Sequence, residues 1–314
     1  MKAKNSATAF APASMGNVGV GFDILGLAFE EPGDTVRAEP RPEPGAVLTA
    51  IHGDGGRLPL DSAKNSATVA ANSVLQAINA PHGVNLVLHK NLPLASGLGS
   101  SAASAVAAAV AVNALFHVPL TLPNLLPACL DGEAAVSGYH PDNVGPSLLG
   151  GITLITGTSL REMQRLPVPD NLHCALVTPN VAVPTAEARA VLPQHITLKQ
   201  MVHQTGGVAR LVDALHRGDL EVVAAAMESD CVIEPARTHL MPLVAEMRAV
   251  AKSNGALALV ISGAGPTLCA VCTSAAIAQQ VADAMHARYQ EAGYDSLARH
   301  TRVSVDGARV IETS

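Results

Sequence analysis

Tryptophan is absent from this chain of 314 residues, and aromatic residues together make up only 2% of it. Stacking of nucleic-acid bases on aromatic side chains is therefore excluded as a major activity, and the core must be aliphatic. Charged residues are also few, at 15%, and the net charge of −6 comes without a long run of Lys or Arg. Because nucleic-acid binding requires a basic surface, we expect no nucleic-acid partner.

Cysteine is sparse as well, with five residues and no spacing typical of a disulfide framework. This usage suits a reducing compartment, and we expect a cytoplasmic protein. Cys269 and Cys272 have the spacing of a metal knuckle, but residues three apart on a strand face opposite sides, so we interpret them as core cysteines. Residues 1–5 lack the apolar region of a secretory signal.

A membrane anchor is not expected either. Residues 98–116 are long enough to span a bilayer, but they are mostly alanine and lack flanking aromatic or basic belts. A helix that is apolar on all sides in a globular protein is buried. The chain has 48% hydrophobic residues, which predicts a globular protein with one large domain or two.

The order of apolar segments predicts an α+β fold without a regular βαβ series. We place a domain boundary within residues 156–170, giving domains 1–160 and 161–314. Residues 30–45, rich in Pro, Glu and Gly, predict a surface strand and loop. The expected strands are 6–11, 47–51, 84–89, 152–155, 174–178, 256–262, 268–272 and 297–305. The expected helices are 65–78, 104–115, 122–137, 186–192, 199–215, 220–228, 241–253 and 275–292.

The most informative segment is Pro-Leu-Ala-Ser-Gly-Leu-Gly-Ser-Ser-Ala-Ala at residues 93–103, which opens the alanine-rich helix. Gly97 and Gly99 allow a tight turn and close approach of the backbone to a ligand. Ser100 and Ser101 stand where an N-cap and a first helical turn are expected. A glycine loop that leads into a helix N-terminus predicts an anion site, most often for phosphate.

Other interpretations of this loop remain open on the residues alone. No Gly-Lys-Ser/Thr follows, so the segment is not a Walker A motif. It matches the loose dinucleotide fingerprint Gly-x-Gly-x-x-Ala of dehydrogenases, but no Asp or Glu occurs between Gly97 and Leu130 to bind a ribose. A plain glycine turn before a packed helix, without a ligand, is the third alternative.

Three motifs in order resemble those of the GHMP small-molecule kinases. The loop at 93–103 resembles their phosphate-binding motif, residues 11–26 (Ala-Pro-Ala-Ser-Met-Gly-Asn-Val-Gly-Val-Gly-Phe-Asp-Ile-Leu-Gly) the first motif, and residues 261–268 (Ile-Ser-Gly-Ala-Gly-Pro-Thr-Leu) the third. The resemblance implies a two-domain α+β GHMP kinase fold. Its N-terminal domain is expected to be like ribosomal protein S5 domain 2, and its C-terminal domain ferredoxin-like.

The resemblance also implies ATP and Mg²⁺ as cofactors. Phosphoryl transfer needs a phosphate cradle, a metal ion and a positioned acceptor. The implied metal ligands are Ser101 and Glu133, although Glu133 taken alone would be read as a solvated helix residue. The implied nucleotide-binding residues are Asn65, Pro93, Leu94, Ala95, Ser96, Gly97, Leu98, Gly99, Ser100, Ser101, Ala102 and Ala103.

Further segments resemble the GHMP members that phosphorylate the amino acid L-homoserine. They are residues 138–146 (Gly-Tyr-His-Pro-Asp-Asn-Val-Gly-Pro), 184–193 and 234–237. The resemblance implies substrate binding by Asn17, Asp23, His140, Thr185, Arg189, Arg237 and Gly263. A guanidinium matches a carboxylate at two points, so Arg189 and Arg237 suit the α-carboxylate, and Asp23 suits the α-ammonium.

The residues expected to act in catalysis are Asn143, Asp142 and Arg189. Where mevalonate-type members carry an Asp near the acceptor hydroxyl, this chain has Asn143, and an amide is not a useful base near neutral pH. Asp142 is adjacent, but it does not inherit that geometry. Our hypothesis is catalysis without a dedicated base, in which the proton goes to a phosphate oxygen.

The resemblance therefore implies an ATP- and magnesium-dependent kinase that converts L-homoserine to O-phospho-L-homoserine, a step of threonine biosynthesis. Another GHMP kinase acting on mevalonate or shikimate is the first alternative, and a catalytically inactive relative that binds nucleotide is the second. A homodimer is implied by the resemblance alone, because no exposed apolar stripe identifies an interface.

Overall fold

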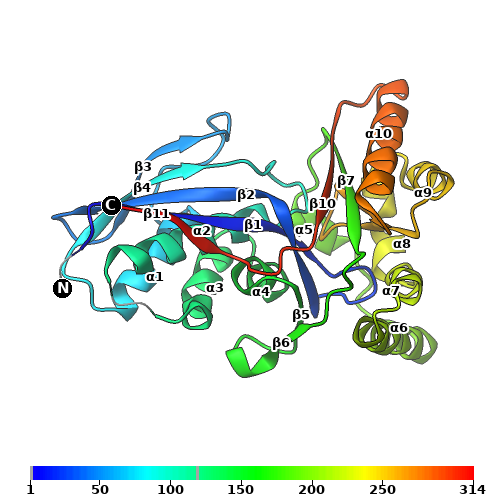
Figure 1. Cartoon of the computed structure of the whole chain (residues 1–314), viewed down its shortest axis with the longest axis horizontal. Coiled ribbons are helices and arrows are strands. Elements are labelled where there is room, and N and C mark those ends of the chain that lie inside the picture. Colours follow the sequence, from blue (N-terminus) through cyan, green and yellow to red (C-terminus); the bar gives the residue numbers. More distant parts are fainter. Residues whose placement is uncertain (1–2, 118–119) are drawn as a thin grey trace.

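The computed structural model describes residues 3–117 and 120–314, and it contains two sheets, each with its own helical layer (Figure 1). Met1 and Lys2, which begin the segment considered for a secretory signal, lie outside the described residues. In the larger sheet the strand order is β11-β1-β2-β4-β3, with β5 paired to β2 and β6 to β5. In the smaller sheet it is β10-β7-β9-β8.

The larger sheet forms around two long antiparallel strands, β1 (Ala7–Gly16) and β2 (Leu25–Arg41). In the first half of β1, Ala7, Ala9 and Ala11 are buried while Thr8 and Phe10 are half-buried, so one face of the strand lies in the core. The other strands of this sheet are β3 (Ala46–His52), β4 (Gly83–His89), β5 (Ile152–Ile155), β6 (Met163–Leu166) and β11 (Arg309–Thr313).

The chain returns to the larger sheet at its end, because β11 pairs with β1. β6 likewise joins this sheet through β5. Both strands lie beyond the boundary placed in residues 156–170, so the two sheets do not divide at one point of the sequence. The division into 1–160 and 161–314 stays a prediction.

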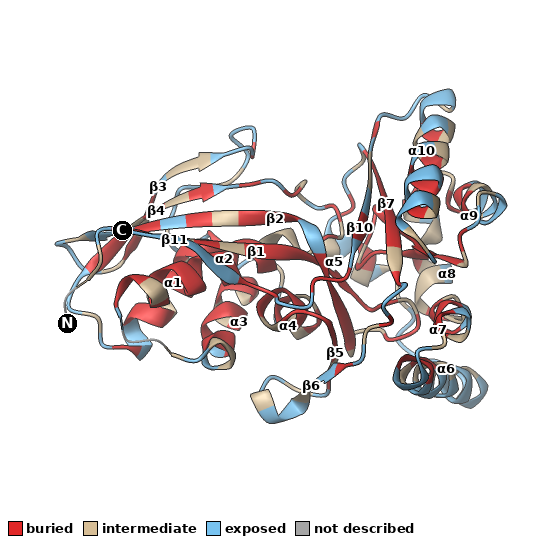
Figure 2. Ribbon diagram, viewed as in Figure 1, coloured by how far each residue is buried: buried red, intermediate tan, exposed pale blue. Residues whose placement is uncertain are grey.

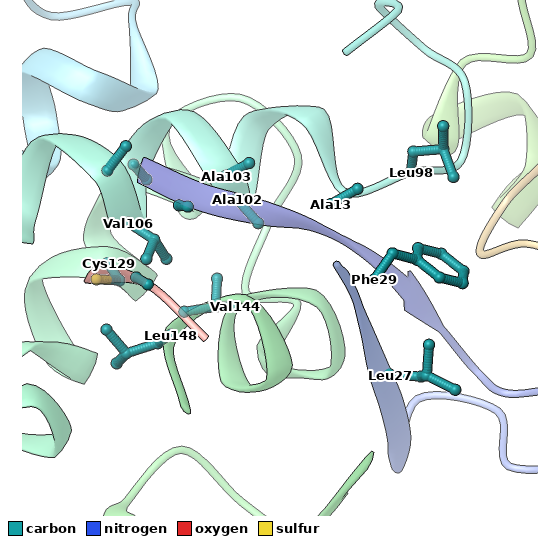
Figure 3. Packing of buried hydrophobic residues seen from close by; sticks show 14 of the residues in the cluster. Ala13, Leu27, Phe29, Leu98, Ala102, Ala103, Val106, Cys129, Val144 and Leu148 are labelled. Atoms are coloured by element: carbon teal, nitrogen blue, oxygen red, sulfur yellow. The ribbon is translucent and has the colours of Figure 1, made fainter. Parts of the chain in front are cut away.

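Four helices cover one face of the larger sheet (Figure 1). They are α1 (Ser66–Ala77), α2 (Ser100–Leu115), α3 (Leu126–Ala134) and α4 (Pro141–Leu149). Every residue from Ala102 to Asn113 is buried, which confirms the prediction of a buried alanine helix. Alanine side chains let α2 pack closely on β1, β2 and α1 at once, and Figure 3 shows its first turns inside this core.

The smaller sheet is antiparallel and contains β7 (His173–Pro179), β8 (Ala258–Ile261), β9 (Leu268–Cys272) and β10 (Ser296–Arg302). In chain order its strands are arranged 4-1-3-2, and helices α9 (Val244–Ser253) and α10 (Ala275–Glu291) precede β8 and β10. This is the ferredoxin-like βαββαβ arrangement. Cys269 and Cys272 are buried and unbridged on β9, as predicted.

A helical insertion separates β7 from α9. It contains α5 (Thr185–Ala190), α6 (Leu198–Arg217), α7 (Leu220–Met227) and α8 (Ile233–Arg237). Short 3-10 turns occur at Leu122–Leu125, Leu160–Glu162 and Thr238–Leu240. Figure 2 shows that much of the surface of α6 is exposed, whereas β7 is mostly buried. No described helix is both long and apolar enough to cross a membrane.

The prediction of a surface strand and loop at residues 30–45 is wrong for the strand, whereas the loop is confirmed at residues 42–45. This segment lies mostly in β2, which is paired to β1 on one side and to β4 on the other. Val36 and Ala38 face the core, whereas Arg37 and Glu39 are exposed. The charged residues of this segment led to the prediction of a surface position. Some of them lie on the exposed face of the strand, and Asp34 is buried because it forms a salt bridge with a buried lysine.

Two of the helical segments also differ from the predictions. Residues 122–137 form a 3-10 turn followed by the shorter α3, rather than one helix. Helix α4 was not predicted, because Pro141, Gly145 and Pro146 are all poor residues for a helix interior. Pro141 occupies the first turn, where a missing N–H costs nothing, so the helix forms despite its composition.

Candidate active site

The loop between β4 and α2 is wedged between two other segments of the chain. Gly97 has φ +77°, and a Cβ there would lie 2.2 Å from the Ser262 carbonyl oxygen. Gly99 has φ +61°, and a Cβ there would lie 2.1 Å from Ser14 Oγ. Only glycine combines this backbone conformation with this lack of space.

Hydrogen bonds connect the three sequence motifs at this loop. The Ser14 N–H donates to the Leu98 carbonyl oxygen at 3.1 Å. Ser262 Oγ donates to the Gly97 carbonyl oxygen at 2.8 Å, and the Thr267 N–H donates to the Ser96 carbonyl oxygen at 3.1 Å. Segments that are far apart in the sequence therefore build one site.

The start of α2 differs in detail from the prediction. The N-cap is Gly99, which is left-handed and has no side-chain cap, and Ser100 is the first helical residue. The first N–H groups of a helix have no partner within the helix, and here no side chain caps them. Such an end is suited to an anion.

A cavity of about 580 Å³ extends from this loop to α4, α5 and α8. It brings together most of the predicted residues: Asn17, Asp23, Asn65, Leu94, Ala95, Ser96, Gly97, Gly99, Ser100, Ser101, Glu133, His140, Asp142, Asn143, Thr185, Arg189, Arg237 and Gly263. Leu98, Ala102 and Ala103 are instead buried in the hydrophobic core (Figure 3), and Pro93 is not among the residues that line the cavity. Asn65 lines it while capping α1, since its Oδ1 accepts from the Ala67 N–H at 3.0 Å.

Glu133 is a buried carboxylate with an unused ligand atom. It is 3% exposed, and its Oε2 has no hydrogen-bond partner among the described residues. Burial raises the pKa of Glu133 to about 7, despite the opposing effect of the Ser101 hydroxyl. An unpaired buried carboxylate beside a hydroxyl is a donor set that suits magnesium, so the residues present fit the ion implied by the sequence.

Asp23 and Arg189 form a two-point ion pair across the cavity. Arg189 Nη1 donates to Asp23 Oδ2 at 3.1 Å, and Arg189 Nη2 donates to Asp23 Oδ1 at 2.7 Å. Arg189 Nη2 also contacts His140 Nδ1 at 3.1 Å, and Arg189 Nε is buried without a partner among the described residues. Arg189 therefore keeps one donor free for a further acceptor.

His140 is held in one tautomer by its neighbours. Its Nδ1 accepts from Arg189, so the ring hydrogen lies on Nε2, which donates to the Ser137 carbonyl oxygen. Burial lowers the pKa of His140, and the Arg189 charge adds to this effect. The ring is therefore neutral near pH 7.

The Gly263 carbonyl oxygen is hydrogen-bonded to two of the predicted residues. Its carbonyl oxygen accepts from Asn17 Nδ2 at 2.9 Å and from Arg237 Nη1 at 3.1 Å. Asn17 Oδ1 accepts from the Asp23 N–H at 3.0 Å, and Arg237 Nε donates to the Ala188 carbonyl oxygen at 3.0 Å. These contacts join the first motif, α5 and the third motif, and they position Asp23 and Arg189.

Asp142 and Asn143 lie in the first turn of α4, and both line the cavity. Asp142 is buried, and burial followed by the charge of Asp23 raises its pKa to about 7. Asn143 Oδ1 accepts from Ser14 Oγ at 3.2 Å. Ligand atoms of Asp23, His140 and Asp142 lie within 4.8 Å of one another, which concentrates acidic groups beside the Arg189 guanidinium.

The stability of the ligand-free protein is expected to fall as the pH rises from about 4 to 7. Folding raises the pKa of Asp142 from 3.8 and that of Glu133 from 4.5, each to about 7. In this window the folded state binds more protons than the unfolded chain, so the free energy of unfolding decreases with pH. Urea denaturation between pH 4.5 and 8 without divalent cations measures the slope.

An Asp142→Asn variant supplies the control for this prediction, because its amide cannot titrate. The variant should show a flatter dependence of stability on pH than the wild type. Parallel curves for the two proteins would contradict the assignment of the slope to Asp142.

The sequence patterns did not single out several residues in or against the cavity wall, among them Lys90, Asp34 and Phe22. Lys90 is buried in the cavity wall and forms a salt bridge with Asp34. The Phe22 ring packs against two guanidiniums, with Arg189 Cζ 5.5 Å and Arg237 Cζ 5.3 Å from its centroid. No pattern in the sequence indicates that Lys90 and Asp34 are buried partners, but Phe22 lies within the first motif and could have been singled out.

Family models match both parts of the chain. The model described as the GHMP kinases N-terminal domain matches residues 65–151, and the GHMP kinases C-terminal model matches residues 211–291. The chain belongs to the GHMP kinase family. The predicted family and the two-domain GHMP kinase fold are confirmed, and the alternative of a dehydrogenase is wrong.

The more similar relatives carry one name within this family. The chain is 38% identical to a homoserine kinase from Chloroherpeton thalassium, over 97% of this chain and 99% of the relative. It is 39% identical to a homoserine kinase from Xylella fastidiosa, over 98% of this chain and 95% of the relative. The crystal structure of homoserine kinase from Cytophaga hutchinsonii superposes with a TM-score of 0.94 at 38% identity, covering 99% of each chain.

A more distant neighbour shares the fold alone. Mevalonate kinase from L. major, solved with R-mevalonate, has a TM-score of 0.69 at 17% identity, with 96% of this chain and 97% of that chain covered. The fold is thus common to kinases of different acceptors, and the acceptor must be argued from the side chains of the site.

Proposed function

We propose that this protein transfers the γ-phosphoryl group of ATP to the side-chain hydroxyl of L-homoserine, giving O-phospho-L-homoserine for threonine biosynthesis. The observation that carries the proposal is the Asp23–Arg189 pair beside the phosphate loop. Full-length similarity to proteins named homoserine kinase supports the same acceptor.

The pair offers one partner to each charge of an amino acid. The Arg189 guanidinium suits the α-carboxylate, and the Asp23 carboxylate suits the α-ammonium. A zwitterion can replace the internal pair without leaving either charge unpaired. Mevalonate and shikimate have no ammonium group, so either would leave Asp23 without a partner.

The phosphate side of the site is assigned to the loop and to the start of α2. The uncapped N–H groups at Gly99–Ser101 would hold nucleotide phosphates. Ser101 and Glu133 would hold magnesium, which when bound neutralises phosphate charge during transfer.

In the proposed reaction the homoserine oxygen forms a bond to the γ-phosphorus as the bond to the bridging oxygen of ADP breaks. The hydroxyl proton passes to an oxygen of the transferred phosphoryl group. Asn143 would orient the acceptor hydroxyl, and Arg189 would anchor the other end of the substrate. A loose transition state requires little activation of the nucleophile, so positioning accounts for most of the catalysis.

Asp142→Asn is expected to keep kcat within about 10-fold of the wild type, because no general base is required. The Asp142 carboxylate lies near Asp23, which is proposed to bind the α-ammonium. Removal of its charge should therefore weaken substrate binding and raise KM for L-homoserine. Steady-state kinetics from pH 6 to 9 separate the two parameters. A loss of kcat of about 10²-fold or more in a folded variant would favour Asp142 as the base.

Asn143→Ala is the matching variant on the neighbouring residue. We expect a lower kcat, since the hydroxyl would no longer be oriented, and little change in KM for ATP. Full turnover in this variant would remove Asn143 from the mechanism.

The function is tested by ADP release with ATP and magnesium in the presence of L-homoserine, L-serine, L-threonine, mevalonate, shikimate or no acceptor. A strong response to L-homoserine supports the proposal. A response only to another alcohol would reassign the acceptor within the GHMP kinases. ATP binding without turnover on any acceptor would indicate the second alternative, an inactive relative.

We also propose a cytoplasmic location, supported by the five free cysteines, all within the described residues. The homodimer stays a prediction from the family, and sedimentation of the purified protein tests it.

A further inference from the structure

A lysine is buried directly beneath the phosphate loop. The side chains of Lys90 and Asp34 are 1% and 0% exposed, and they form a salt bridge. Lysine is almost never fully buried unless it is paired, and a buried pair is costly to desolvate. Because burial of this pair is costly, we looked to its contacts for a role other than stability.

The pair is connected to the first turn of α2. Lys90 Nζ donates to the Ser100 carbonyl oxygen at 2.8 Å, to Ser100 Oγ at 2.7 Å and to Ser104 Oγ at 2.9 Å. Asp34 Oδ1 accepts from the N–H groups of Asn91 at 3.0 Å and Leu92 at 3.3 Å. Strand β2, the start of the phosphate loop and the start of α2 are thus tied together.

These contacts determine what the Ser100 hydroxyl can do. An ammonium group only donates, and its three hydrogens are shared here among four acceptors. Ser100 Oγ therefore accepts from Lys90, and its own hydrogen remains available for another acceptor. Ser100 lines the cavity beside Gly99. Ser104 also lines the cavity, but its hydroxyl donates to Asp34 Oδ2 at 2.9 Å.

We propose that Lys90 is a positioning residue for the nucleotide: held by Asp34, it orients the Ser100 hydroxyl as a donor to a phosphate group in the cavity. Lys90 acts through Ser100 and does not contact the nucleotide itself. The inference rests on the nucleotide site of the proposed function. It assigns to Ser100 a role separate from that of Ser101, whose hydroxyl would bind the metal.

The test compares ADP with adenosine, because only ADP presents a phosphate. The variant is Asp34→Asn/Lys90→Met, which removes both charges, keeps an acceptor for Asn91 and Leu92, and leaves no buried charge unpaired. Affinities of the full-length protein are measured by calorimetry with magnesium. We expect ADP to bind about 10-fold more weakly and adenosine to bind within about twofold of the wild type.

Ser100→Ala completes a double-mutant cycle. In the wild-type background it should weaken ADP binding by about as much as the Asp34→Asn/Lys90→Met change, and in that variant background it should have little further effect. Val110→Ala, in the core at the far end of α2, is the control for a general loss of stability. It should change neither affinity.

Three results would overturn the inference. They are unchanged ADP affinity in the folded double variant, an equal loss for ADP and adenosine, and an additive effect of Ser100→Ala. Failure of the wild type to bind ADP would instead reject the proposed function, so the two failures are distinguishable.

Discussion

Replacement of Arg189 by alanine is expected to lower kcat/KM for L-homoserine by about 10²- to 10³-fold. The guanidinium is bonded to both carboxylate oxygens of Asp23 and to His140. The variant would lose the carboxylate partner of the substrate and would leave Asp23 without its cation. Steady-state kinetics with varied L-homoserine measure the effect.

Most of this loss should appear in KM, because Arg189 contacts the substrate away from the transferred phosphoryl group. The KM for ATP should change little. Arg217→Ala is a matched control, since Arg217 is an exposed arginine paired with Asp213 on the surface of α6. A folded Arg189→Ala enzyme with wild-type kcat/KM would contradict the proposed carboxylate site.

Glu133→Gln is expected to abolish most activity while raising the stability of the ligand-free protein. Without a cation, the buried carboxylate is destabilising, as its raised pKa of about 7 and its unpartnered Oε2 indicate. The amide removes that charge, so the melting temperature should rise at pH 8. Loss of the metal ligand should lower kcat by about 10²-fold or more.

Stability is expected to rise while activity falls, and this combination distinguishes loss of a metal ligand from general damage to the fold. Thermal denaturation without divalent cations and ADP release with magnesium measure the two effects on one preparation. Asp131→Asn is the control on the same helix, because Asp131 accepts from Ser73 Oγ and the amide retains an acceptor. Glu133→Gln with both lower stability and full activity would reject Glu133 as the metal ligand.

Much of the site could be predicted because short segments of the sequence specify its chemistry. Gly97 and Gly99 are required by the backbone of the loop, and they stand directly before the alanine helix. The buried helix was predicted for the same local reason, since alanine leaves no polar face. Local composition misleads at Pro141, where helix α4 was not predicted, and in the charged half of β2, where the prediction of a surface strand was wrong.

By itself, the sequence determined the family, the two-domain fold, the phosphate loop and most of the residues around the cavity. The tertiary structure alone decided how distant charges are paired. Asp23 and Arg189 are 166 residues apart, and Asp34 and Lys90 are 56 residues apart. The physical reason is that burial and pairing of a charge depend on which strands and helices meet, and no local pattern of residues encodes that meeting.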